Sequence, residues 1–432
     1  MGMGMGLERE KPMSSTLPGL VHAAGLAASQ GRWDEAEQHW RQVLVLDPNH
    51  PQALHSLGVH AYRRGQLAEA LQAMRAAHAV TPNDPMLLLS ISVVLRDQNK
   101  PSDELAALDG ALAIDPYFLP GLLAKGACLE RLARPKAAAA WYRNALKAAP
   151  PEAHWPEALR SQLQRARAVS QHIGNELAAF LAASMGSRLA ALTPLEAQRF
   201  REAGAILSGH SQAYTSQCSQ LQVPRLPAIP FYERAQFAWV EALEASTAAI
   251  SAELIEVLQR EQSAFRPYIA YAPGAPLNQW QELNHSPRWS SYFLWRNGEP
   301  QLDHLASCPN TRRALEAVEM ADIGGLCPNA MFSALAPRTR IPPHTGETNA
   351  RVIVHLPLIV PAHCRYRVGF EHRQWQVGET LIFDDSIEHE AINDSDQLRV
   401  VLIFDVWNPL LSTAERDLVR VLSAAVQEFH SQ

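Results

Sequence analysis

The chain has 432 residues, of which 47% are hydrophobic and 19% charged, with a formal net charge of -6. This composition excludes a disordered or collagen-like protein, and the length exceeds that of a usual single core, so we expect at least two domains. The acidic balance leaves no basic surface that could neutralise a phosphate backbone, and nucleic acid is not an expected partner.

The cysteines and the N-terminus indicate a cytoplasmic protein. The five cysteines are odd in number and form no Cys-x-x-Cys pair, which is typical of a reducing compartment. Met and Gly alternate over residues 1–7 without the basic and apolar regions of a secretory signal, and we expect residues 1–16 to be disordered. The apolar stretch at 352–362 is too short to cross a bilayer, so we expect no membrane association.

A constant period runs through the first third of the chain. Small residues recur at one fixed interval, and prolines recur at the same interval: Ala24, Gly58, Ser92 and Gly126; Pro48, Pro82, Pro116 and Pro150. The period predicts pairs of antiparallel helices with small residues where two helices cross closely.

Over residues 17–150 this period resembles the tetratricopeptide repeat, whose length is about 34 residues. Glu104 stands where the repeat has Ala, and Ala133 stands where it has Gly, so we expect the third repeat to be distorted. Stacked repeats form a concave surface that can hold a peptide or protein, or can serve only for packing. Both roles stay open, and the expected partner is a peptide or protein substrate.

The second half of the chain changes from helical to β-type patterns. Residues 151–220 read as a helical linker region, and scattered prolines then mark the start of a second domain over 221–432. Short β-branched and aromatic runs predict strands at 292–295, 330–335, 351–360, 364–370, 380–383 and 398–407, followed by a helix over 413–429. Short strands with tight polar turns favour a jelly roll. The predicted fold class is therefore α+β multidomain, with an all-α repeat solenoid before a double-stranded β-helix.

Two histidine blocks and an arginine carry the functional prediction. The runs from His344 to Arg351 and from Leu381 to Glu390, followed by Arg399, resemble the signature of the aspartyl/asparaginyl β-hydroxylases. The resemblance implies an oxygenase that depends on Fe(II) and 2-oxoglutarate. His344 and His389 would hold the iron, and Arg399 would pair with the far carboxylate of 2-oxoglutarate. The spacing from His389 to Arg399 fits one turn between antiparallel strands.

The third iron ligand is left open by the sequence. A facial triad has a carboxylate two residues after the first histidine, and Gly346 stands there. The resemblance implies that water takes this position, because active members of the family have the same glycine. Glu347 and Asp385 are the alternative ligands.

The resemblance also assigns residues around the two ligands. Ser333 would help to hold the distal carboxylate of 2-oxoglutarate, and His355 would contact this co-substrate near the metal. Arg351 would lie close to the substrate carboxylate, or would serve as a structural ion-pair partner. Ile353 and Glu299 replace basic residues that the family places next to an acidic substrate.

The predicted reaction is hydroxylation of a peptide or protein at the β-carbon of Asp or Asn. Two other classes of function stay open. One is a peptide-binding repeat scaffold with an inactive oxygenase-like domain, and the other is a cupin-type metal enzyme that works without 2-oxoglutarate. The paired Asp384 and Asp385 are expected to stabilise a turn rather than to act as an acid and a base.

Overall fold

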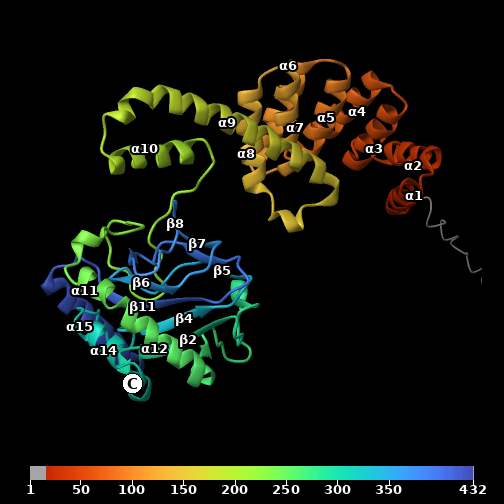
Figure 1. Ribbon diagram of the computed structural model, residues 1–432. Helices are drawn as coiled ribbons and strands as arrows, with labels where there is room; N and C mark the ends of the chain where they lie inside the picture. Colours follow the sequence, from red (N-terminus) through yellow and green to blue (C-terminus); the bar gives the residue numbers. More distant parts are fainter. Residues whose placement is uncertain (1–15, 432) are drawn as a thin grey trace, which may run out of the picture. The chain divides into compact units, whose positions relative to one another are not determined.

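The computed structural model describes residues 16–431 and divides the chain into two compact units, residues 1–210 and 211–432 (Figure 1). The segment expected to be disordered lies outside the described residues except for Thr16, whose hydroxyl oxygen accepts from the backbone N–H of Gly19 and caps the first helix. Within residues 16–431, no helix combines the length and the apolar character that crossing a membrane requires.

The first unit begins with four antiparallel hairpins, each of which joins a 13-residue helix to a 14-residue helix. The helices are α1 (Leu17–Ser29), α2 (Trp33–Leu46), α3 (Pro51–Arg63), α4 (Leu67–Val80), α5 (Pro85–Asp97), α6 (Pro101–Ile114), α7 (Leu119–Arg131) and α8 (Pro135–Ala148). The predicted repeat hairpins over 17–150 are confirmed.

The expected distortion of the third repeat is wrong. Gly31, Gly65, Asn99 and Ala133 occupy the same position in the four hairpin turns, and all have positive φ, of 73°, 74°, 54° and 54°. Asn and Ala therefore adopt the left-handed conformation that Gly takes in the first two turns. The buried Glu104 accepts a hydrogen bond from Arg131 of the next hairpin, so it is accommodated by an ion pair.

The small residues of the repeat mark close helix crossings, as predicted. A Cβ atom on Gly58 would lie 2.8 Å from Cγ of Met74, and one on Gly126 would lie 2.4 Å from Cε1 of Tyr142. Both distances are shorter than van der Waals contact, so a larger residue at either position would push the paired helices apart.

The 31-residue helix α9 (Arg160–Ala190) and the 14-residue helix α10 (Pro194–Leu207) follow the repeats. The chain then joins the second unit, before the boundary predicted near residue 220. The backbone N–H of Gln217 donates to the carbonyl of Ser386 at 2.7 Å, and that of Ser219 donates to the carbonyl of Gly346 at 3.1 Å.

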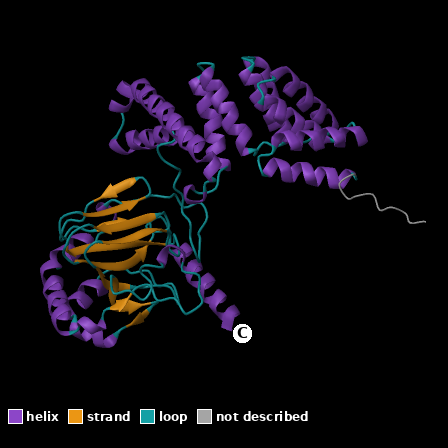
Figure 2. Cartoon of the chain, turned by 90° about the vertical axis from the view of Figure 1, so that its right-hand side faces the viewer, coloured by secondary structure: helices purple, strands orange, loops and turns teal. Residues whose placement is uncertain are grey.

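The second unit contains two antiparallel sheets (Figure 2). The larger sheet has the order β1-β2-β4-β11-β6-β9, with β3 beside β2, and the smaller has the order β5-β10-β7-β8. The larger sheet comprises β1 (Arg266–Pro267), β2 (Trp289–Arg296), β3 (Glu299–Pro300), β4 (Ala330–Leu335), β6 (Arg351–Ile359), β9 (Leu381–Phe383) and β11 (Arg399–Trp407). The smaller sheet comprises β5 (Thr339–His344), β7 (Cys364–Val368), β8 (Glu371–Arg373) and β10 (His389–Asn393).

Side chains of β11 alternate between two apolar layers, as the period of a strand requires. Val400, Leu402 and Phe404 pack in the cluster that contains Leu254 of α12 (Thr247–Arg260), so helices cover this outer face of the larger sheet. Val401 packs with residues of both sheets. Arg399 therefore points to the face between the sheets.

The helices of the second unit are short, apart from α12 and the C-terminal α15. They are α11 (Val240–Ala245), α12 (Thr247–Arg260), α13 (Leu302–Ser307), α14 (Pro309–Glu316) and α15 (Thr413–Ser431). Six strands and α15 were predicted. The short strands β5 and β10 were not, although they carry the two candidate ligands.

Candidate active site

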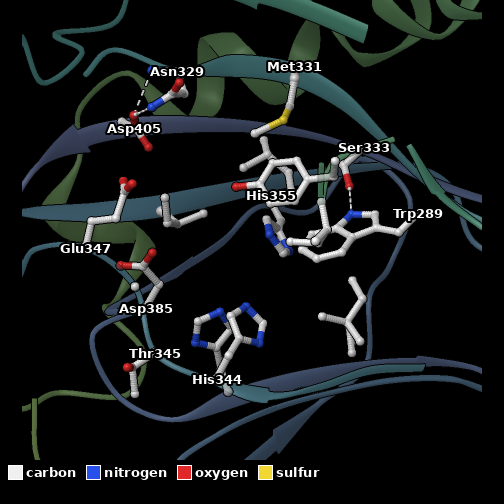
Figure 3. Close-up of a pocket in the computed structure, with 18 of the residues that line it drawn as sticks. Trp289, Asn329, Met331, Ser333, His344, Thr345, Glu347, His355, Asp385 and Asp405 are labelled. Carbon is white, nitrogen blue, oxygen red and sulfur yellow. Dashed lines mark hydrogen bonds between the residues drawn. The ribbon is translucent and has the colours of Figure 1, made fainter. Parts of the chain in front are cut away.

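A cavity of about 400 Å³ lies between the two sheets. All six predicted site residues line it: Ser333, His344, Arg351, His355, His389 and Arg399. Figure 3 shows Glu347 and Asp385 on one side of this cavity and Ser333 and Trp289 on the other, with His344 below them.

The two candidate ligands are brought together by strand pairing. His344 ends β5, His389 begins β10, and the two residues are direct partners in the register, with ring centroids 4.0 Å apart. Nδ1 of His344 lies 2.8 Å from the carbonyl oxygen of Pro342, and Nδ1 of His389 lies 3.0 Å from that of Ile387. A carbonyl only accepts, so each Nδ1 carries the proton and each Nε2 keeps a lone pair for a metal.

Both imidazoles are neutral at physiological pH. Burial lowers the pKa of His344 to about 3, and the neighbouring His389 adds to this effect. Burial likewise lowers the pKa of His389 to about 4. Metal ligation requires the neutral ring, so the site is ready to bind a cation without first losing protons.

The carboxylate of Asp385 fills the space that a side chain at position 346 would need. A Cβ atom on Gly346 would lie 2.1 Å from Oδ2 of Asp385, so no carboxylate side chain fits at this position of the triad. Asp385 is itself held by Nη1 of Arg351, which donates to Oδ1 at 2.8 Å. Within residues 16–431, no three His, Cys, Asp or Glu side chains form a metal-binding group.

We expect Gly346→Ala to damage the site although it adds one methyl group. The new Cβ would displace the Asp385 carboxylate and break its buried pair with Arg351, which costs about 3–5 kcal/mol when one partner is lost. Urea unfolding of the variant and of Gly324→Ala, at an exposed position of the same unit where a Cβ atom would lie 3.8 Å from Oε1 of Gln427, measures the difference. Equal losses of stability in the two variants would contradict the packing argument.

Arg399 is a buried cation, and no acidic side chain within residues 16–431 pairs with it. Its side chain is 1% exposed, its Nη1 donates only to the carbonyl of Ser333 at 3.4 Å, and its Nε has no hydrogen-bond partner. The ring of Trp375 lies under the guanidinium at 4.8 Å. Burial lowers the pKa of Arg399 to about 10, yet the group stays charged at neutral pH. The cavity therefore presents a positive charge that an anion can neutralise.

Two indoles orient the remaining polar groups. Nε1 of Trp289 donates to Oγ of Ser333, and Nε1 of Trp375 donates to Nδ1 of His355, both at 3.2 Å. Because its Nδ1 accepts, the neutral ring of His355 carries its proton on Nε2 and is a donor there. Neither Trp289 nor Trp375 is among the site residues predicted from the sequence.

Arg351 lies in a cluster of carboxylates. Its guanidinium pairs with Asp385, with Glu347 at 3.5 Å and with Asp405 at 3.4 Å. Burial raises the pKa of both Glu347 and Asp405. The ion pairs fit the predicted role of Arg351 as a structural partner. Arg351 also lines the cavity, and its contact with the carboxylate of a substrate stays a prediction.

The connection between His389 and Arg399 differs from the prediction. Strands β10 and β11 are not neighbours but belong to opposite sheets, and residues 394–398 cross from one to the other. Asn393 fixes this crossing because its amide nitrogen donates to the carbonyls of Leu335 and Gln397 at 3.0 and 2.9 Å. Asp384 accepts from the backbone N–H and hydroxyl of Ser386, which confirms its expected place in a turn.

Comparison with known proteins agrees with this geometry. Residues 244–409 match the family model of the aspartyl/asparaginyl beta-hydroxylases, and residues 23–85 match a tetratricopeptide repeat model. The chain carries an aspartyl/asparaginyl β-hydroxylase domain behind tetratricopeptide repeats. The predicted family likeness and the predicted order of the two parts are confirmed.

Curated relatives are also similar to this chain. The aspartyl/asparaginyl beta-hydroxylase of Mus musculus is 34% identical over 38% of this chain and 23% of its own length. The ornithine lipid ester-linked acyl 2-hydroxylase of Rhizobium tropici is 36% identical over 45% of this chain and 66% of its own. Human aspartate beta-hydroxylase domain-containing protein 2 is 33% identical over 47% of this chain and 53% of its own length. The chain thus spans less than two thirds of the length of each of these relatives.

Proposed function

We propose that the protein is a hydroxylase that depends on Fe(II) and 2-oxoglutarate. The observation that carries this proposal is the pairing of two functions in one cavity. Two neutral imidazoles present free Nε2 atoms, and Arg399 presents a buried charge that no acidic side chain of the described part of the chain neutralises. A metal alone would leave the charge of Arg399 unpaired. A co-substrate with two carboxylates would bind the metal through one of them and pair with Arg399 through the other.

The residues of the cavity fit iron and 2-oxoglutarate in distinct ways. His344 and His389 would supply two ligands, and oxygen atoms of the co-substrate and of water would complete the set. Arg399 would pair with the distal carboxylate, with the Ser333 hydroxyl beside it, and the Nε2 proton of His355 would be donated nearer the metal. When bound, iron would activate dioxygen for oxidation of a C–H bond.

The remaining predictions belong to this proposal. The two facing antiparallel sheets suit a double-stranded β-helix, and we expect a cytoplasmic enzyme. The repeats would contribute a partner or substrate surface. There are two candidate substrate classes. One is the Asp or Asn side chain of a peptide, predicted from the family likeness, and the other is an acyl chain, suggested by the name of the rhizobial relative.

We expect the purified protein to convert 2-oxoglutarate to succinate and carbon dioxide when Fe(II), oxygen and a substrate are supplied. Succinate is measured by mass spectrometry in the presence of iron and in a metal-chelated control. Iron bound to the protein, with no succinate above the control and no binding of 2-oxoglutarate, would favour the scaffold. Turnover of a substrate with bound iron but without 2-oxoglutarate would favour the cupin-type enzyme.

A further inference from the structure

The inner face of the larger sheet carries its side chains in cross-strand rows, which separate the cavity into zones. Arg399 lies opposite Leu335, and Val401 lies opposite Ser333. These two rows hold Arg399 and Ser333, the groups proposed to bind the distal carboxylate of the co-substrate. Successive rows on one face of a sheet are about 7 Å apart, so the next rows along the strands line a different part of the cavity; His355, at the end of the next row, is proposed to contact the co-substrate near the metal.

The next row is apolar across three strands. Phe293 lies opposite Met331, Met331 lies opposite Ile403, and Ile403 lies opposite His355. Beyond it, Ile353 lies opposite Asp405. All of these residues line the cavity, and Figure 3 shows Met331 between the carboxylate of Asp405 and Ser333.

A loop extends this apolar wall. The ring of Tyr268 stacks on Trp289 at 4.2 Å and on Phe293 at 6.4 Å. Trp280 contacts His344 edge-on at 5.0 Å. Tyr268 and Trp280 both line the cavity, so aromatic side chains face the same space as the apolar row. Such a wall gains free energy by removing aliphatic surface from water, about 25 cal/mol per Å².

No inner cation is left for an acidic substrate. Arg399 is taken by the proposed co-substrate, and Arg351 is shared by Glu347, Asp385 and Asp405. Three carboxylates around one guanidinium would repel a further carboxylate. At the edge of the cavity, Arg296 is exposed, forms no ion pair in the part of the chain that the structure describes, and lies over the ring of Phe293 at 5.1 Å.

We propose that the segment hydroxylated by this enzyme is an aliphatic chain that lies on Phe293, Met331, Ile353 and Ile403, with its anionic end at Arg296. This inference rests on the proposed function and names its substrate class. One oxygen atom of dioxygen would enter the C–H bond as a hydroxyl group, and the other would enter succinate. The C–H bond and the decarboxylated 2-oxoglutarate would each supply two of the four electrons.

The test compares three probes at saturating 2-oxoglutarate and Fe(II). Laurate is a free acyl chain, vesicles of dilauroylphosphatidylglycerol carry a lipid-bound chain, and a synthetic Asp-containing peptide carries an acidic side chain. We expect succinate formation to rise with an acyl probe, together with a product that is heavier by one oxygen atom on its chain. Turnover of laurate or of the vesicles decides between a free and a lipid-bound acyl chain.

Met331→Lys places a charge in the apolar row, where an unpaired cation is strongly disfavoured next to a hydrocarbon chain. We expect acyl hydroxylation to fall more than about tenfold, while 2-oxoglutarate binding persists. Leu302→Lys, on the exposed face of α13 outside the cavity, should leave all rates unchanged. Met331→Leu keeps the row apolar and should keep the preference for an acyl probe over the peptide. If it does, the loss in Met331→Lys is due to the charge and not to intolerance of any substitution at this position.

The outcomes separate the inference from the proposed function. Oxygen found only on the Asp peptide, or bound 2-oxoglutarate that no acyl probe consumes, would overturn the aliphatic substrate and leave the co-substrate assignment standing. A protein that binds iron but neither binds nor consumes 2-oxoglutarate would overturn both.

Discussion

Replacing His389 with Ala is expected to abolish iron retention and succinate formation together. The imidazole is one of the two proposed protein ligands of the metal, and its Nδ1 is already committed to the carbonyl of Ile387. Loss of an outer-shell partner alone costs about 10–100-fold in metal affinity, so loss of a ligand should exceed this range. Iron per chain is measured by elemental analysis after desalting, and succinate is measured in the same samples.

The control for this variant is His372→Ala, since His372 lies exposed on β8 of the same sheet. It should retain iron and activity. Circular dichroism of both variants tests whether the buried change at His389 has unfolded the domain. A folded His389→Ala protein that keeps wild-type iron content would place the metal elsewhere and remove the proposed site.

The helical repeats could be predicted from sequence because their signal is local and periodic. The constant interval sets both the hairpin turns and the close helix crossings, and it identified Gly58 and Gly126 as contact points. Glu104 and Ala133 misled the prediction, because Glu104 pairs with Arg131 of the next hairpin and Ala133 adopts the positive φ that Gly has in the first two turns.

The β domain was harder to predict from the sequence, because the contacts that fix its strands join residues far apart in the chain. Strand β5 contains Pro342 and Pro343, which obscure a strand pattern, and the crossing between β10 and β11 depends on the distant Leu335 and on Gln397. Six cavity residues were still found, because they stand in recognisable sequence blocks. The apolar row was missed, because Phe293, Met331 and Ile403 become neighbours only through strand register.

Arg399→Met is expected to weaken 2-oxoglutarate binding strongly while it stabilises the ligand-free protein. A charge-assisted hydrogen bond contributes about 1.5–3 kcal/mol, so the 2-oxoglutarate concentration needed for half-maximal turnover should rise roughly 10- to 150-fold. Iron content should not change, because Arg399 faces the opposite end of the proposed co-substrate. Titration of 2-oxoglutarate with succinate as the readout, and elemental analysis of iron, measure these two effects.

The opposite effect on stability follows from the state of the guanidinium. Among residues 16–431 its Nε has no hydrogen-bond partner and the side chain is 1% exposed, so a buried charge is held without an acidic neighbour in this part of the chain. An apolar side chain of similar length removes this desolvation penalty and keeps the contact with Trp375. The melting temperature of the ligand-free variant should therefore rise above that of the wild type.

Added 2-oxoglutarate should raise the wild-type melting temperature, as a ligand that binds only the folded state does, and should barely change that of the variant. A variant that melts lower than the wild type without ligand, yet gains as much stability from 2-oxoglutarate, would show that Arg399 supports the fold rather than the co-substrate.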